Sequence, residues 1–254
     1  TRLVDAGVAL RYDTDDAIWT RPGKAYSLVA HLRLKGRLEA ILKCADSVMC
    51  ANEFLAEHLR KMNKHAKVVP MAIDVGMCDE THQNTQAFTL GWTGAPGNLP
   101  FLSLCEKPVG EFLKKHPQAK LRIMCGEKPT LSIPFEHVPW TPEGEAAFLK
   151  TLSVGLLPLP QKDDFVLGKS PIKALMYGAC GVPVVGNMAH GGAAEIASHG
   201  GCLSVTTDAE WLAALESLMK QDAHTRMSEL VRKNIETHHD RRKVFAQVLQ
   251  SLRG

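Results

Sequence analysis

Short apolar stretches alternate with longer stretches of helical period along most of the chain. Runs such as 154–159 and 182–185 carry no charged residue, which is typical of strands buried on both faces of a parallel sheet. Between such runs, segments such as 101–115 repeat apolar positions every three to four residues, as amphipathic helices do. The alternation predicts an α/β protein built on parallel sheets.

Two series of elements are expected. The first has strands at 8–12, 47–50 and 67–70, and helices at 27–45 and 53–62, the second of which is capped by Asn52. The second series has more elements: strands at 88–92, 120–124, 136–138, 154–159, 182–185 and 202–205, and helices at 101–115, from 171, from 195, at 210–219 and at 223–252.

A polar, aperiodic segment at 74–86 separates the two series and is the best linker in the chain. The first series is short, and the sequence starts at Thr1, without Met, close to a strand-like segment. We therefore expect a fragment or a processed chain in which the N-terminal domain is incomplete, because half a domain exposes sheet edges and apolar surface.

Composition narrows the class of protein. The chain has 254 residues, 45% of them hydrophobic, and a formal charge of +3 that is scattered along its length. Nucleic-acid binding by phosphate neutralisation needs a concentrated basic surface, so it is not expected. No apolar run approaches the ~20 residues that cross a bilayer, and no secretory signal opens the chain.

The seven cysteines are dispersed and form no C-x-x-C pair. Their pattern predicts buried thiols in a reducing compartment, without a disulfide frame or a zinc site. His238, His239 and Asp240 are consecutive, so on a helix they point in different directions. They are interpreted as part of a solvated helix face and not as metal ligands.

Ligands of parallel sheets bind outside the carboxyl ends of the strands, so the loops after each strand carry the candidate chemistry. Asp13, Asp15 and Asp16 follow the first strand. Three neighbouring carboxylates repel one another and require solvent, a cation, hydrogen-bond donors or a catalytic use. A solvated acidic turn is the alternative.

Two glycine-containing loops join a strand to a helix. Gly94, Gly97 and Asn98 lie in the first, where a backbone without side chains can approach a phosphate or sugar. Gly192 and Glu195 lie in the second, after the strand at 182–185. A carboxylate at a helix start is also favoured for structural reasons alone.

The segment 168–175 is the most informative. Ser170 suits a helix cap and Pro171 the first helical turn. Lys169 and Lys173 are four residues apart and fall on one side of that turn. Two ammonium groups beside a helix N-terminus are unfavourable unless an anion joins them, which indicates a diphosphate site. Two solvated lysines are the alternative.

Together these segments resemble the group-1 (family 4) retaining glycosyltransferases, which have a two-domain B-type fold. Residues 168–177 (GKSPIKALMY) and 181–185 (GVPVV) resemble that family's "GKSPIKxLEYMAxGVPVV". Residues 12–19 (YDTDDAIW) resemble the "YDIDDAxW" of one branch. Residues 51–56 and 68–74 resemble its "GNxxLA" and "VxPNxID" segments. The matches run in order from about residue 8 to residue 245.

The resemblance implies an acceptor-side Rossmann-like domain at 1–86, a nucleotide-sugar domain at 87–229, and a helix at 230–254 that returns toward the first domain. It implies transfer of a sugar from a nucleoside-diphosphate sugar to a hydroxyl group of a glycan or lipid-linked acceptor, without cofactor or metal. Cell-envelope polysaccharide synthesis and a cytoplasmic location follow from it. The basic clusters at 232–233 and 241–243 suggest peripheral contact with the inner membrane face, or else solvated helix faces.

Site roles follow from the same resemblance. The residues expected to act in catalysis are Asp15, Asp16, Lys169 and Lys173. The residues expected to bind the donor are Gly94, Gly97, Asn98, Gly126, Trp140, Thr141, Ser170, Pro171, Ile172, Met176, Gly192 and Glu195. Trp140 and Thr141 are candidates for flanking the nucleobase, with an ordinary half-buried Trp as the alternative.

The chain departs from the family pattern at two places. Gly168 and Met176 occupy the positions of the family's Glu-x7-Glu pair, and Met71 replaces the Asn of "VPN". Met176 cannot accept a hydrogen bond from ribose as Glu does. A degenerate domain that binds without turnover is therefore a second hypothesis. A haloacid-dehalogenase-type phosphatase, suggested by Asp13 and Asp15, is a remote third, because Ala17 stands where that family needs Thr or Val.

Overall fold

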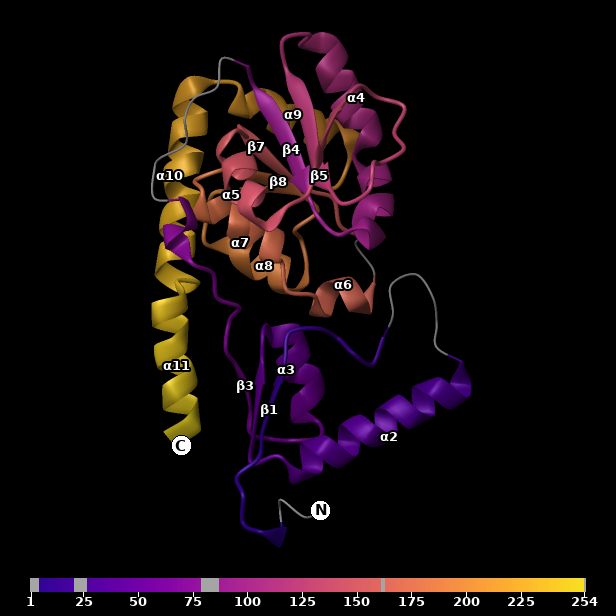
Figure 1. The fold of residues 1–254 in the computed structure, drawn as a ribbon, viewed down its shortest axis with the longest axis vertical. Helices are drawn as coiled ribbons and strands as arrows, with labels where there is room; N and C mark the ends of the chain where they lie inside the picture. The colour runs from indigo at the N-terminus through magenta and orange to yellow at the C-terminus, as the bar shows by residue number, and fades with distance from the viewer. Residues whose placement is uncertain (1–4, 21–26, 79–86, 161–162, 254) are drawn as a thin grey trace.

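The computed structural model of the chain describes residues 5–20, 27–78, 87–160 and 163–253. The expected linker residues 79–86 and the start of the chain at Thr1 lie outside the described residues. Within them, two parallel sheets occupy opposite ends of the long axis, and two long helices follow each other along one side of the molecule, one beside each sheet (Figure 1).

The smaller sheet has the order β1-β2-β3, and all its strands are parallel. Its strands are β1 (Arg11–Thr14), β2 (Ser47–Cys50) and β3 (Ala66–Val68), and its helices are α2 (Leu28–Cys44) and α3 (Glu53–Arg60). The side chain of Asn52 caps α3 by accepting from the backbone N–H of Leu55 at 3.0 Å, as the sequence predicts. Leu42, Val48 and Leu59 are fully buried between these elements.

The larger sheet contains six parallel strands in the order β6-β5-β4-β7-β8-β9. The strands are β4 (Thr89–Thr93), β5 (Lys120–Cys125), β6 (Glu136–Pro139), β7 (Val154–Leu157), β8 (Val184–Gly186) and β9 (Cys202–Ser204). Around the sheet lie α4 (Glu106–Lys115), α5 (Pro142–Lys150), α6 (Asp164–Gly168), α7 (Ile172–Ala179), α8 (Gly191–Ser198), α9 (Asp208–Leu218), α10 (Gln221–His238), and the 3₁₀ segments η1 (Val75–Cys78) and η2 (Pro96–Leu104).

Helices cover both faces of this sheet. Phe112 of α4 and Trp211 of α9 belong to the buried cluster on one face, and Phe148 of α5 and Leu175 of α7 to the cluster on the other. When β4 is counted as the first strand and β9 as the sixth, the strands lie side by side in the order 3-2-1-4-5-6. This is the doubly wound Rossmann arrangement. The predicted α/β class with parallel, Rossmann-like sheets is confirmed.

The strand order reverses between β4 and β7, and the fully buried Tyr177 of α7 lies at this point. Its hydroxyl accepts from the N–H of Thr93 at 3.1 Å and lies 3.4 Å from the carbonyl oxygens of Gly91 and Leu156. Burial raises the pKa of this phenol, which therefore stays neutral. One hydroxyl thus joins β4 and β7 just before the two strands separate.

The described chain passes from one domain to the other near Ile73 and again near Asp240. The backbones of these two connections are hydrogen-bonded to each other. Ile73 donates its N–H to the carbonyl of His239 at 2.8 Å and accepts from the N–H of Arg241 at 3.0 Å. Asp74 forms an ion pair with Arg241 at 2.9 Å. After this point α11 (Arg241–Arg253) runs along the smaller sheet (Figure 1), where Ser251 Oγ lies 3.2 Å from Met49 Sδ. The expected boundary at 229/230 falls inside α10.

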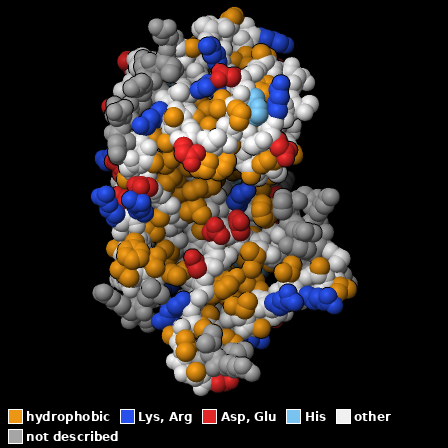
Figure 2. Space-filling view, in the orientation of Figure 1, with side chains coloured by type: hydrophobic (Ala, Val, Ile, Leu, Met, Phe, Trp, Pro, Cys, Tyr) orange, Lys and Arg blue, Asp and Glu red, His pale blue; other side chains and the backbone are white. Residues whose placement is uncertain are grey.

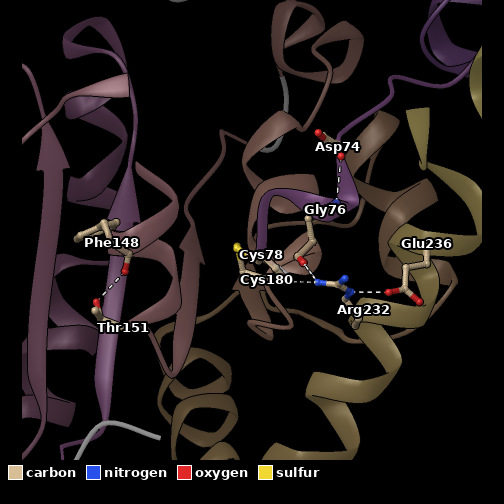
Figure 3. Close-up of a disulfide and its surroundings, with 9 residues drawn as sticks. Asp74, Gly76, Cys78, Phe148, Thr151, Cys180, Arg232 and Glu236 are labelled. Atoms are coloured by element: carbon tan, nitrogen blue, oxygen red, sulfur yellow. Dashed lines mark hydrogen bonds and ion pairs between the residues drawn. A yellow bond between two sulfur atoms is a disulfide. The ribbon is translucent and has the colours of Figure 1, made fainter. Parts of the chain in front are cut away.

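Cys78 and Cys180 form a disulfide, which corrects the interpretation of all seven cysteines as free thiols (Figure 3). It ties η1, in the interdomain connection, to the residue that follows α7. Arg232 of α10 donates to the carbonyl oxygens of Cys78 and Ala179 and pairs with Glu236. Disulfides are typical of oxidising compartments, so the cysteines no longer favour a reducing one. The remaining five cysteines are free, and only Cys44 of these is exposed.

Other local expectations also need correction. The helix expected at 223–252 is two helices, α10 and α11, that separate at 239–240. His239 is buried, and its Nδ1 lies 2.9 Å from the carbonyl of Met71, so it does not belong to a solvated face. The helix expected at 101–115 begins as the 3₁₀ segment η2, which contains Pro100. The sequence did not indicate α5 or α6.

The basic clusters near the C-terminus make contacts within the protein. Arg232 and Arg241 are engaged as described above, and Lys243 Nζ donates to the carbonyl of Glu236 at 2.7 Å. These contacts account for three of the five side chains that the sequence suggested for lipid contact.

Candidate functional site

A cavity of about 480 Å³ opens at the carboxyl ends of β4 and β7, where the strand order reverses. Three loops form most of its wall. Residues 93–96 follow β4, residues 157–159 follow β7, and residues 169–173 lead into α7. Crevices of this kind are where doubly wound sheets bind ligands.

Lys173, in the first turn of α7, reaches back to β4. Its Nζ lies 4.0 Å from the ring centroid of Trp92, a side chain that is only 1% exposed. A Cβ on Gly94 would come within 2.3 Å of the same Nζ, so a larger residue there would displace the ammonium group. Burial, and then the charge of Lys169, lower the pKa of Lys173 to about 7.

Lys169 lies at the mouth of the same cavity. Its Nζ donates to Asn98 Oδ1 at 3.3 Å, which links the loop before α7 to the loop after β4, and it lies 5.4 Å from the ring centroid of Phe165. Among the described residues, neither Lys169 nor Lys173 forms an ion pair with a carboxylate. An anion that entered between the two ammonium groups would relieve their repulsion.

The start of α7 is open. Pro171 is the N-cap residue and no side chain caps the helix, so the N–H groups of the first turn have no side-chain acceptor. The expected cap, Ser170, is buried and points its hydroxyl to Met71 Sδ at 3.0 Å. Free N–H groups and two lysines therefore face one opening, an arrangement that suits a phosphate or diphosphate.

A second polar group lies where β4, β6 and α5 meet. Glu145 Oε1 accepts from the indole N–H of Trp140 at 3.0 Å and from Thr93 Oγ1 at 3.3 Å. Thr141 is the N-cap of α5, and its hydroxyl accepts from the N–H of Gly144 at 3.0 Å. Trp140 is 45% exposed and lines the cavity, whereas Thr141 does not.

The acidic loop after β1, in the smaller domain, lies beside the segment that leads to α7, because a Cβ on Gly168 would come within 2.4 Å of the Cβ of Ala17. Burial raises the pKa of Asp13 and of Asp16, and the charge of Asp15 raises both further. The positive charge of Lys169 partly opposes the rise for Asp16. Figure 2 shows acidic and basic side chains close together in the middle of this face.

Gly192 and Glu195 lie at the contact between the domains and not in the cavity wall. Glu195 is in the middle of α8, and its Oε1 accepts from the N–H of Glu53 at 2.9 Å, at the start of α3. A Cβ on Gly192 would lie 3.1 Å from Asn52 Nδ2, which itself donates to the carbonyl of Gly168. Glu195 therefore does not start α8, as the sequence suggested, but stabilises the helix start of the other domain.

The cavity thus contains ten of the sequence-predicted residues: Gly94, Asn98, Gly126, Trp140, Lys169, Ser170, Pro171, Ile172, Lys173 and Met176. Gly97 is exposed beside it, and Asp15 and Asp16 are not among the residues of its wall. Sequence reasoning missed Trp92, Thr93 and Glu145. The only signal for Glu145 was its place one turn beyond a Thr-Pro helix start, next to a candidate tryptophan.

The described residues contain no group of three or more side chains that could hold a metal ion. None of the described helices combines the length and the apolar character that crossing a membrane requires.

No protein-family model and no curated protein sequence matches the chain. Solved structures do match it. HepE from Anabaena, in complex with UDP-glucose, aligns with 98% of this chain and 73% of its own at a TM-score of 0.74 and 11% identity. Sucrose-phosphate synthase from Thermosynechococcus elongatus aligns with 97% and 67% at 0.70 and 15% identity.

The UDP-forming α,α-trehalose-phosphate synthase from Burkholderia vietnamiensis aligns with 98% of this chain and 70% of its own, at a TM-score of 0.69 and 12% identity. Likeness at these identities is a likeness of fold. The chain therefore has the two-domain B-type fold of these glycosyltransferases, as the sequence motifs predicted. A haloacid-dehalogenase phosphatase is not supported by this fold.

Proposed function

We propose that the chain is a glycosyltransferase that moves a sugar from a nucleoside-diphosphate sugar to a hydroxyl acceptor. The observation that carries the proposal is the pair Lys169 and Lys173 beside the open start of α7, at the crevice where the strand order reverses. The complex of HepE with UDP-glucose, a protein of the same fold, supports a nucleotide sugar as the ligand.

Departure of the diphosphate is the step for which these groups are suited. Negative charge grows on the leaving oxygen as the bond to the sugar breaks, and fixed cations and N–H donors at that position stabilise it. Lys169, Lys173 and the first-turn N–H groups of α7 would take this role. Asp15 and Asp16, in the smaller domain, would contact the acceptor or the transferred sugar.

Finer assignments rest on the motif resemblance. We place the chain among the group-1 enzymes and expect transfer with retention of configuration, because residues 168–177 and 12–19 resemble that family's segments. A glycan or lipid-linked acceptor and a role in cell-envelope polysaccharide synthesis belong to the same proposal. The resemblance also implies a cytoplasmic location with peripheral membrane contact, although the disulfide between Cys78 and Cys180 does not favour a reducing compartment. The proposal also includes a reaction that requires no cofactor.

A domain that binds the nucleotide sugar without turning it over is the second candidate. The observation that favours it is Met176, which lines the cavity where the resembling family has a carboxylate. Release of nucleoside diphosphate from a bound donor, measured with and without acceptor glycans, separates the two. Stabilisation by donors with no release of diphosphate favours the binding domain.

A panel of nucleoside diphosphates and their sugars tests the proposal directly. We expect UDP, ADP, GDP or CDP to raise the melting temperature of the chain, by roughly 5–10 °C at a hundredfold excess over Kd. Adenosine or uridine without phosphate is the control and should give little change. If none of the diphosphates stabilises the protein, the proposal is wrong.

Binding should also take up a proton. With a pKa of about 7, Lys173 is mostly neutral at pH 8 in the free protein, and a diphosphate beside it favours the charged form. The affinity should therefore rise as pH falls from 9 to 7. Calorimetry in buffers of different ionisation enthalpy measures the uptake, which should approach one proton at pH 8. The variant Lys173→Met should abolish it, and equal uptake in that variant would contradict the assignment.

A further inference from the structure

The cavity has one carboxylate among the described residues of its wall, and it is Glu145. This side chain extends from the second turn of α5 to the end of β4, where it meets Thr93. Thr93 directly precedes Gly94. A Cβ on this glycine would come within 2.3 Å of the Nζ of Lys173, so the two residues are neighbours in the wall. The carboxylate therefore lies in the same cavity wall as Lys173 and is hydrogen-bonded to the residue that precedes Gly94.

The two oxygens of Glu145 have different surroundings. Oε1 accepts from both Trp140 Nε1 and Thr93 Oγ1, which fixes the orientation of the carboxylate. None of the described residues donates a hydrogen bond to Oε2. A carboxylate can accept several hydrogen bonds, so Glu145 is held in place and still has an acceptor to offer.

The other uncharged polar side chains of the wall already have hydrogen-bond partners within the protein. Asn98 Oδ1 accepts from Lys169, the Ser170 hydroxyl is directed to Met71, and Thr93 donates to Glu145. Met176 contributes only a thioether, a weak acceptor. A ligand with two adjacent hydroxyl groups next to its diphosphate would bury donors in this cavity, and buried donors need partners.

We propose that Glu145 accepts hydrogen bonds from the ribose hydroxyls of the nucleotide, and so determines the preference for ribonucleotides. This inference rests on the proposed function, because it assumes a nucleoside diphosphate in the cavity. Glu145 supplies from α5 the carboxylate that position 176 lacks. Its bond to Trp140 also holds the indole at the cavity wall, beside the place that the ribose occupies.

The test compares each nucleoside diphosphate that stabilises the chain with its 2′,3′-dideoxy counterpart, for example UDP with 2′,3′-dideoxy-UDP. The wild-type chain should bind the ribonucleotide about 10–100-fold more tightly, the range expected for hydrogen bonds to a charged acceptor. Glu145→Gln, which keeps the shape of the side chain, should lose most of this ratio because it weakens ribonucleotide binding and leaves dideoxynucleotide binding unchanged. Isothermal titration calorimetry measures both affinities.

Trp140→Phe is the matched control. It removes the indole N–H from Glu145 but keeps the carboxylate and its hydrogen bond from Thr93, so the ribose preference should remain even if both affinities fall. An equal loss of both ligands in Glu145→Gln would mean that Glu145 only shapes the cavity, and would overturn this inference while the proposed function stands. A wild-type chain that binds none of the diphosphates would overturn both.

Discussion

Replacing Lys169 and Lys173 together by Met should reduce the affinity for a nucleoside diphosphate by roughly 10²–10⁴-fold. Each lysine would lose a charge-assisted bond to phosphate, worth about 1.5–3 kcal/mol. The folded protein should tolerate the change, because Met keeps most of the apolar stem and Lys173 is already largely neutral near pH 8. Calorimetric titration gives the affinity, and a melting curve without ligand checks the fold.

The matched control is Lys114→Met with Lys128→Met, two exposed lysines outside the cavity wall. This variant also removes two lysines, so it lowers the net charge by at least as much, and it should bind as the wild type does. If both double variants lose affinity equally, general electrostatic attraction explains the binding. If neither loses any, the start of α7 is not the diphosphate site.

Breaking the disulfide between Cys78 and Cys180 should destabilise the chain by about 2–4 kcal/mol. The two cysteines are 102 residues apart, so the bond restrains a long loop in the unfolded chain. For a chain of this size the loss corresponds to a fall in melting temperature on the order of 5–15 °C. Calorimetry of Cys78→Ser/Cys180→Ser, compared with wild-type protein, measures it.

Reduction provides an independent check. A phosphine reductant should lower the melting temperature of the wild-type protein and leave that of the double variant unchanged. Cys44→Ser, which removes an exposed free thiol, should melt as the wild type does. A non-reducing alkylation experiment that modifies Cys78 and Cys180 as readily as Cys44 would contradict the presence of the bond.

Much of the fold could be predicted because its signals are local. The central strands β4, β7 and β8 of the larger sheet are buried at every position, so they appear as short apolar runs. Asn52 identified the start of α3 because an N-cap acts over only three residues. The loops around Gly94 and Lys169 were found because parallel strands present their carboxyl ends at one edge.

The remaining features depend on contacts between distant residues. Nothing near Cys78 indicates that it meets Cys180, and the pairing follows only from how η1 packs on α7. Glu195 has the sequence position of a ligand-binding carboxylate, yet the smaller domain supplies its partner at Glu53. Glu145 lacked a recognisable motif, and its place in the cavity comes from the docking of α5 beside β4.

The start of α7 is a further place where a contact with a distant residue overrides a local sequence signal. Ser170 precedes Pro171 and has the usual side chain for an N-cap, but the fold places Met71 close enough to take its hydroxyl. Tertiary packing thereby leaves the helix start without a side-chain cap. A helix that satisfied its own N–H groups would have no donors left for a ligand.

The pairing of residues 73 and 240 affects how the protein can move. Both covalent crossings between the domains are bonded to each other through Ile73, and Asp74 and Arg241 add an ion pair at the same place. A displacement of one connection would displace the other, because their backbones are hydrogen-bonded. We therefore expect any opening of the cleft to pivot near this joint, which would move the smaller domain while leaving the wall formed by β4, β7 and α7 intact.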